Sequence, residues 1–181
     1  MSERFYSIDP TNLKHIELLD DYNKENGVFT PIGQINKEKI QEDNEFSMEL
    51  VLPIDFAVTT EYSNDTETTT KAIYELGKED MGLDIGEKSI QLFEDNLKDA
   101  KIVVWNGPLG VYEFEKYKLG TDTLLKYLVD NNIKTILGGG DIVAAASNAG
   151  YKDKVYHAST GGGATLEYLE GKELPGLAVI K

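Results

Sequence analysis

Three glycine-rich segments contain the residues of this chain that are best suited to chemistry. Eight of the 17 glycines fall in them, and each segment follows an apolar run. Glycine triplets in mid-chain are costly in unfolded-state entropy, so they indicate backbone with positive φ or backbone that must approach another group closely. The three segments are Asn106–Gly110 (NGPLG), Gly138–Gly140 and Gly161–Gly163.

The second and third glycine segments open predicted helices directly, at Asp141 and Ala164. The first N–H groups of a helix have no intrahelical acceptor and lie at the positive end of the helix dipole, so both segments could bind an anion through backbone amides. The alternative is that they are only tight strand-to-helix turns, as in any parallel α/β domain. Three such segments at successive strand ends favour a phosphate site over that alternative.

The spacing of the glycines excludes two common phosphate-binding motifs. Neither triplet continues as G-x-G-x-x-G, because Val143 and Leu166 stand where the last glycine would be. The chain also contains no G-x-x-x-x-G-K-[ST]. A dinucleotide fingerprint and a Walker A loop are therefore both ruled out.

Composition narrows the possible ligands and partners. The 18 Lys and Arg against 32 Asp and Glu give a net charge of −14, which repels nucleic acid and anionic membranes. There is no cysteine, so disulfides, Cys-ligated metals and Cys nucleophiles are excluded, and two histidines leave little scope for a His-rich metal centre. No apolar run approaches 18 residues and the first residues are polar, so we expect a cytoplasmic protein without nucleic-acid or membrane partners.

Strands and helices alternate in the predicted elements that would position the glycine segments. This alternation indicates βαβ units with right-handed crossovers. The predicted fold class is α/β, with a three-layer, doubly wound, mainly parallel sheet that is Rossmann-like and binds ligands at the carboxyl ends of its strands. Predicted strands cover 101–105, 134–137, 155–158 and 177–180, and predicted helices cover 90–97, 121–131, 141–149 and 164–170.

The first part of the chain has a different character. Residues 1–48 are rich in Asn, Asp, Glu and Lys and form an unassigned segment with two predicted helices, one from Asp9 to Gly27 and one over 37–45. Residues 49–181 form the predicted ligand-binding domain. It opens on a buried strand over 49–58 and an exposed loop over 59–70.

Three longer motifs resemble the C-terminal, nucleotide-binding domain of the phosphoglycerate kinase family. They are VVWNGPLGVYE (103–113), GGGD (138–141) and HASTGGGATLEYLEGKELPG (157–176). LPID (52–55) and GLDIG (82–86) fit the same domain. The resemblance covers roughly residues 50–181, and three motifs in this order and spacing are far more specific than a lone glycine pattern.

The resemblance implies phosphoryl transfer between 1,3-bisphosphoglycerate and ADP in glycolysis, with Mg-ADP or Mg-ATP as the bound nucleotide. Asn106 would contact the nucleotide phosphates, Glu113 the ribose hydroxyls, and Asp141 the metal. The amides of Gly161, Gly162 and Gly163, together with Gly140, would act in catalysis by facing the transferring phosphoryl group. The remaining residues with an implied nucleotide contact are Gly138, Gly139, Gly140 and Ile142.

Simpler interpretations of the same residues stay open. Asp141 could be only a helix cap, Asn106-Gly107 only a turn, and Glu113 only a surface carboxylate. Ile142 stands where the family usually has a hydroxyl residue, which removes one hydrogen bond to a phosphate or to the metal shell.

The chain also departs from the family as a whole. It contains no counterpart of the family's lysine-bearing segment GGAKVxDK. It also lacks a counterpart of the N-terminal domain, which alone would bind 3-phosphoglycerate. The chain therefore resembles an incomplete kinase, from which we expect no catalysis on its own. The rival interpretation is a non-catalytic remnant that binds nucleotide or another protein.

Overall fold

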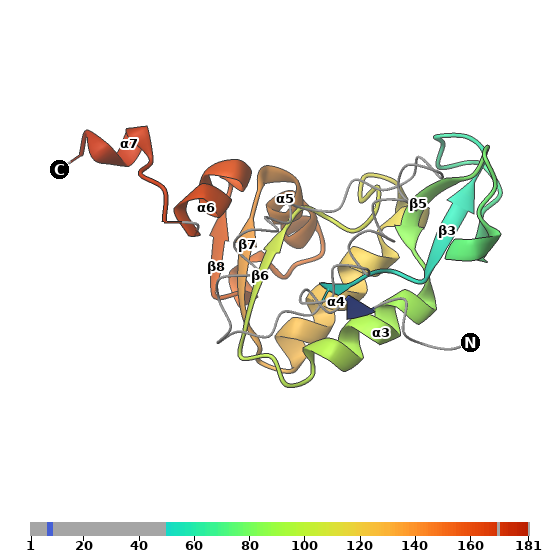
Figure 1. Ribbon diagram of the computed structural model, residues 1–181, viewed down its shortest axis with the longest axis horizontal. Coiled ribbons are helices and arrows are strands. Elements are labelled where there is room, and N and C mark those ends of the chain that lie inside the picture. Colours follow the sequence, from blue (N-terminus) through green and yellow to red (C-terminus); the bar gives the residue numbers. More distant parts are fainter. Residues whose placement is uncertain (1–6, 9–49, 170, 181) are drawn as a thin grey trace. The chain divides into compact units, whose positions relative to one another are not determined.

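A computed structural model describes residues 7–8, 50–169 and 171–180 of the chain (Figure 1). The chain divides into two compact units, Met1–Ile54 and Asp55–Lys181. In the first unit the described residues form a short antiparallel pair, β1 (Ser7–Ile8) with β2 (Leu50–Val51). Both helices predicted between residues 9 and 45 lie outside the described residues.

The second unit begins with an antiparallel sheet of three strands. These are β3 (Asp55–Thr59), β4 (Thr69–Ala72) and β5 (Met81–Ile85), in the order β4-β3-β5. The strand predicted over 49–58 is divided between β2 and β3, with Pro53 in the gap, where a residue without an N–H cannot continue a ladder. The prediction of one mainly parallel sheet missed this antiparallel sheet.

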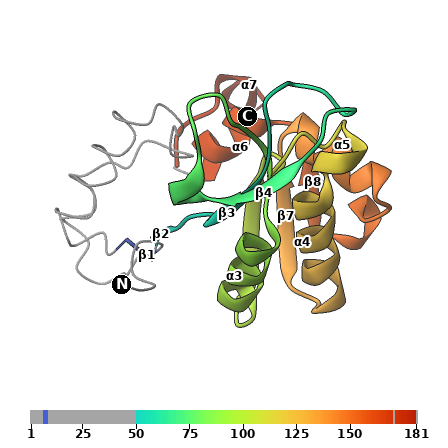
Figure 2. The same ribbon diagram turned by 90° about the vertical axis from the view of Figure 1, so that its right-hand side faces the viewer.

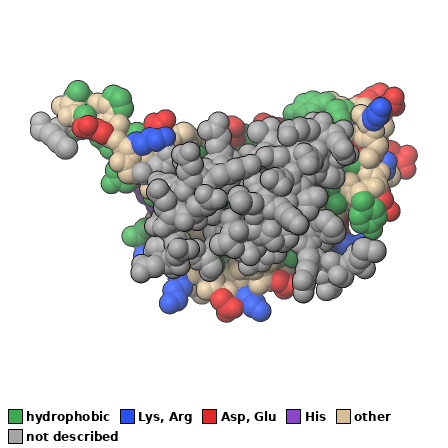
Figure 3. Space-filling view, viewed as in Figure 1, with side chains coloured by type: hydrophobic (Ala, Val, Ile, Leu, Met, Phe, Trp, Pro, Cys, Tyr) green, Lys and Arg blue, Asp and Glu red, His purple; other side chains and the backbone are tan. Residues whose placement is uncertain are grey.

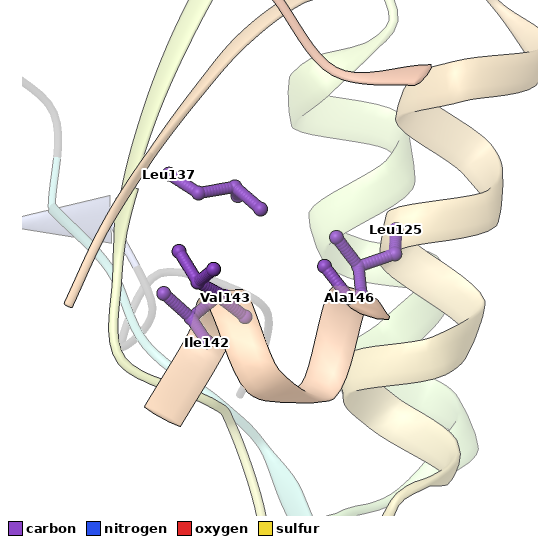
Figure 4. Packing of buried hydrophobic residues seen from close by; sticks show 5 residues of the cluster. All are labelled: Leu125, Leu137, Ile142, Val143 and Ala146. Carbon is purple, nitrogen blue, oxygen red and sulfur yellow. The ribbon is translucent and has the colours of Figure 1, made fainter. Parts of the chain in front are cut away.

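A parallel sheet of three strands follows and confirms the predicted βαβ pattern. Its strands are β6 (Ile102–Asn106), β7 (Lys134–Gly138) and β8 (His157–Ser159), in the order β6-β7-β8. The crossover helices are α4 (Leu119–Asp130) and α5 (Gly140–Asn148). Both pack on the same face, where Leu137 of β7 meets side chains of the two helices (Figure 4); the buried cluster is Leu125, Leu137, Ile142, Val143 and Ala146.

A second buried cluster joins the two sheets. Helix α3 (Glu87–Leu97) connects β5 to β6 and packs beside α4 (Figure 2). The cluster is formed by Ile85 of β5, Ile90 of α3 and Leu124 of α4. Trp105 of β6 packs against both clusters, as expected for an apolar residue near a strand end.

Short helices complete the described chain. Three 3₁₀ helices, η1 (Ile73–Glu75), η2 (Glu115–Tyr117) and η3 (Lys152–Lys154), lie between the longer elements. Helix α6 (Gly162–Leu169) follows β8, and α7 (Pro175–Ala178) lies at the C-terminal end. The prediction of a strand over 177–180 is wrong, because Pro175 starts a helical turn there.

The arrangement of layers agrees only partly with the predicted one. Among the described strands the order β6-β7-β8 follows the sequence, whereas a doubly wound sheet reverses direction. Helix α6 approaches the face opposite α4 and α5, since a Cβ atom on Gly138 would lie 3.4 Å from Thr165 Cγ2. No helix in the described part of the chain is long and apolar enough to cross a membrane.

Candidate functional site

The three glycine segments start from one row of the parallel sheet. Asn106, Gly138 and Ser159 are the last residues of β6, β7 and β8 and lie in register with one another. The carboxyl ends of parallel strands meet at one edge of a sheet, so the loops that leave these residues are neighbours. The structure therefore brings together segments that lie far apart in the sequence.

The middle of each glycine triplet lies against Asn106. Gly139 has a φ of +114°, and a Cβ atom there would lie 3.0 Å from Asn106 Oδ1. A Cβ atom on Gly162 would lie 3.4 Å from the same oxygen and 3.5 Å from Gly139 Cα. The Gly139 N–H donates to the Ser159 carbonyl over 2.8 Å. Side chains at Gly139 or Gly162 would therefore crowd the place where the two loops and Asn106 meet.

A hydroxyl pair supports the third glycine segment, and sequence reasoning missed it. The Gly161 N–H donates to Ser159 Oγ over 3.2 Å. The Thr165 hydroxyl contacts both Ser159 Oγ, at 3.0 Å, and the Gly161 carbonyl. The spacing of Ser159, Gly161 and Thr165 across a strand end and a first helical turn was the available signal for this contact.

The N-terminus of α5 is open. Its N-cap is Gly139, without a capping side chain, and Gly140 and Asp141 in the first turn are exposed. A Cβ atom on Gly140 would meet no atom within 4 Å. Asp141 is thus not the cap of this helix, and its carboxylate lies in the first turn, where the helix dipole favours negative charge. The space over this turn can accept an anion without displacing protein atoms.

Tyr112 connects two of the predicted site residues. Burial raises the pKa of the Tyr112 phenol, and the nearby carboxylates of Glu113 and Asp141 raise it further. The charges of both carboxylates therefore act on this phenol, although Glu113 and Asp141 are far apart in the sequence. Nothing in the sequence distinguished Tyr112 from an ordinary aromatic residue of the loop.

The side chain of Ile142 lies in the core, so a contact with nucleotide at this position would have to use its backbone. The sequence placed it among the nucleotide contacts, but it is 0% exposed and belongs to the cluster with Leu125 and Leu137 (Figure 4). The reason is helical geometry, since Gly140 and Asp141 lie on the open side of α5 while Ile142 and Val143 face the sheet. The accessible part of this turn is therefore Gly140 and Asp141.

The first glycine segment is held from both sides. The Trp105 indole N–H donates to the Gly107 carbonyl over 2.7 Å, directly after β6. The Leu109 N–H donates to Thr121 Oγ1 of α4 over 3.0 Å, and the Val111 N–H donates to the Leu83 carbonyl of β5 over 2.8 Å. The loop leading to Glu113 is thus fixed to β6, α4 and β5.

Asp141 is the carboxylate that the sequence assigns to a metal ion at this site. Within the described ranges, no group of three or more His, Asp or Glu side chains is arranged to hold a metal ion. A single carboxylate such as Asp141 is compatible with the Mg²⁺ sites of nucleotide-binding proteins. In these sites one or two carboxylates bind the ion, and phosphate and water oxygens supply the other ligands. On the face shown in Figure 3, the visible charged side chains of both signs are interspersed rather than gathered into a basic patch.

Comparison with known proteins gives consistent matches. The family model described as phosphoglycerate kinase matches residues 20–172, so the similarity begins well before residue 50, where the resemblance found from the motifs starts. The phosphoglycerate kinase of Clostridium botulinum strain Langeland is 45% identical over 147 residues, and that of Clostridium tetani is 44% identical over 144 residues. These matches cover 81% and 80% of this chain.

Solved structures agree with the sequence matches. Phosphoglycerate kinase from Coxiella burnetii superposes with a TM-score of 0.68 at 35% identity, covering 80% of this chain and 36% of that one. The kinase from Pyrococcus horikoshii gives a TM-score of 0.63 at 29% identity, covering 93% of this chain and 38% of that one. The chain spans 37% of the length of the Clostridium botulinum relative.

Proposed function

Because this chain belongs to the phosphoglycerate kinase family, we propose that it carries part of the ADP/ATP site of that kinase, in its C-terminal nucleotide-binding domain. The observation that carries this proposal is the meeting of Asn106, Gly139 and Gly162 beside the open first turn of α5. Two glycine backbones, one short amide and a helix N-terminus are suited to hold a chain of phosphates in a protein with a net charge of −14.

Apart from Ile142, the predicted nucleotide-binding residues have surroundings that suit their proposed roles. Asn106 contacts the nucleotide phosphates, and Gly138–Gly140 let them approach the backbone. Glu113 is exposed and accepts hydrogen bonds from the ribose hydroxyls. Asp141 is the carboxylate that would hold Mg²⁺, which neutralises phosphate charge when it arrives with the nucleotide.

The glycine amides have the part in this proposal that is closest to the chemistry. Phosphoryl transfer requires little covalent chemistry from a protein and depends on positioning and electrostatic stabilisation. The N–H groups of Gly140, Gly162 and Gly163 can supply both, whereas the N–H of Gly161 is bonded to Ser159 Oγ and would have to leave it to reach the phosphoryl group. The Ser159–Thr165 hydroxyl pair holds Gly161 in that arrangement.

The complete reaction extends beyond these residues. We infer that in the whole kinase the site transfers a phosphoryl group between 1,3-bisphosphoglycerate and ADP in glycolysis, in the cytoplasm. The partner substrate, 3-phosphoglycerate, binds through an N-terminal domain, and further strands complete a three-layer, doubly wound sheet. The second candidate is a non-catalytic remnant that binds nucleotide or another protein.

A substitution at Gly140 tests the nucleotide site directly. We expect Gly140→Val to keep the fold, because its Cβ atom meets nothing within 4 Å, and to fill the space where the phosphates are proposed to lie. We expect the 181-residue chain to bind Mg-ADP weakly and the variant to lose at least tenfold in affinity, about 1.4 kcal/mol or more. Isothermal calorimetry measures the affinities, and amide chemical shifts locate the binding.

Gly176→Val is the matched control, since a Cβ atom on this helical glycine is equally free of neighbours. Equal affinities of Gly140→Val and wild type, or amide shifts away from both glycine triplets, would reject the site. A coupled assay with 3-phosphoglycerate separates the two candidates: turnover by the 181 residues alone would exclude the non-catalytic one.

A further inference from the structure

Asp84 is a buried carboxylate that the proposed site does not use. It lies on β5 and is 3% exposed. Its Oδ1 accepts a hydrogen bond from the Ile85 N–H over 2.8 Å, and its Oδ2 accepts one from the Gly120 N–H over 2.9 Å. Gly120 belongs to the first turn of α4, so a residue of the antiparallel sheet holds the start of the helix that leaves the candidate site.

Two glycines make room for this carboxylate. A Cβ atom on Gly110 would lie 2.5 Å from Asp84 Oδ1, and one on Gly120 would lie 2.6 Å from the same oxygen. No side chain larger than hydrogen fits at either position while Asp84 stays in place. Both ends of the segment 110–120 therefore close on one carboxylate, and Glu113 lies between them.

We propose that Asp84 is a positioning residue for the segment 110–120 and that its ionised form holds Glu113 in place to bind the nucleotide. This inference rests on the function proposed above. An ionised carboxylate accepts through both oxygens, as it does here from Ile85 and Gly120. A protonated carboxyl turns one of them into a hydroxyl oxygen, which accepts only weakly from the N–H group it faces. The segment is then held less firmly.

The surroundings of Asp84 set the pH at which this change occurs. Burial raises the pKa of Asp84 to about 6, and the negative charge of Asp122 on α4 also raises it. The hydrogen bonds from backbone N–H groups act in the opposite direction and lower it. Lys118 at the start of α4 pairs with Glu115 of η2 and with Asp122. The residue of β3 in register with Asp84 is Ala57, which carries no charge. Titration near pH 6 is within reach of ordinary cellular conditions.

Asp84→Asn tests the proposal, because asparagine keeps the shape between Gly110 and Gly120 but has only one acceptor oxygen. At pH 7.5 we expect the variant to bind Mg-ADP about tenfold more weakly than wild type, which corresponds to the loss of one hydrogen bond. The urea concentration at the midpoint of its unfolding should not be lower than that of wild type. Amide signals of residues 110–113 should shift. Between pH 7.5 and 5.5 the affinity of the wild type for Mg-ADP should fall by more than the affinity of the variant. The ligand itself also titrates in this range, but it does so equally with both proteins, so the difference between them reports Asp84. The exposed Asp153→Asn should behave as wild type.

The amide signals decide the proposal without a ligand. In wild type those of residues 110–113 should titrate with a midpoint near pH 6, and in Asp84→Asn they should not. A titration shared by both proteins, or unchanged amide signals in the variant, would overturn the role of Asp84. Absence of Mg-ADP binding by wild type would instead reject the proposed function, and the ligand-free titration would still decide whether Asp84 positions the segment.

Discussion

Asp84 makes the stability of the protein depend on pH. Its pKa is raised to about 6 in the folded state from an ordinary value of 3.8, mainly by burial. Between these values the folded state binds more protons than the unfolded state, so the free energy of unfolding falls as pH rises. We expect the wild type to be about 1.4 kcal/mol more stable at pH 5 than at pH 8 through this residue, measured by urea unfolding.

The comparison with Asp84→Asn isolates this contribution, because the variant shares every other titrating group. Asp80, whose pKa is lowered by the Gly77 N–H and by Lys71, adds stability that is lost only at more acidic pH. If the free energy of unfolding of the wild type instead falls relative to that of the variant as the pH is lowered from 8 to 5, the charge of Asp84 does not destabilise the folded state.

Sequence patterns identified residues better than they identified side-chain directions. The glycine motifs led to Asn106, Gly139 and Gly162, which lie together, and these motifs are local in sequence. Ile142 shows the limit, because its motif position suggests a phosphate contact while the rotation of α5 turns it into the core. Asp84 lies within a recognised motif, but its role depends on Gly110 and Gly120, which only the fold brings to it.

Among the elements, α3 begins with a cap supplied from another part of the chain. Its N-cap residue Gly86 has no side chain, and the buried Asp55 of β3 accepts instead from the Ser89 N–H over 2.7 Å and the Lys88 N–H over 3.2 Å. The Ser89 hydroxyl donates to the same carboxylate over 2.6 Å. This contact joins the antiparallel sheet to the first turn of a helix.

Asp55→Ala should therefore lower the free energy of unfolding by about 3 kcal/mol, since it leaves buried donors of α3 without their acceptor. Urea denaturation measures the loss. Asp65→Ala in the exposed loop serves as the control, and a loss below about 1 kcal/mol for Asp55→Ala would mean that water replaces the cap.

The alternating strands and helices around the parallel sheet could be predicted from the sequence, whereas strands that form only by pairing with another strand could not. The helices α3, α4 and α5 were predicted from apolar periodicity, because each buries apolar side chains in one of the two clusters. The antiparallel sheet escaped notice because β4 is short and polar and gains its place by pairing with β3. Residues 177–180 carry an apolar pattern typical of a strand, and Pro175 overrides it by starting the helical turn α7.

At the scale of the whole described unit, one face of the parallel sheet stays open at β6, beside the part that α6 approaches. Parallel sheets normally have both faces covered, yet Ile102 is 58% and Val104 43% exposed on the side away from α4 and α5. Such apolar surface favours association, while the net charge of −14 opposes it. Salt screens that repulsion, so association should increase with ionic strength.

We expect the wild type to self-associate and the double variant Ile102→Thr/Val104→Thr to remain monomeric in sedimentation equilibrium at 0.5 M salt. Threonine keeps the β-propensity of both positions while making the face polar. Val179→Thr, a similar change at an exposed site outside the sheet, should not alter the wild-type behaviour. A monomeric wild type at high protein concentration would show that the open face does not drive association.

The position of Trp105 gives the protein a built-in optical reporter. It is the single tryptophan of the chain, it packs against both buried clusters, and its indole N–H bonds the carbonyl of Gly107 in the first glycine loop. Its fluorescence is therefore sensitive to the polarity of both clusters and to the hydrogen bond that fixes the loop. Emission wavelength can follow the loss of packing, and the intensity of the native state can follow movement of the loop, without any added label.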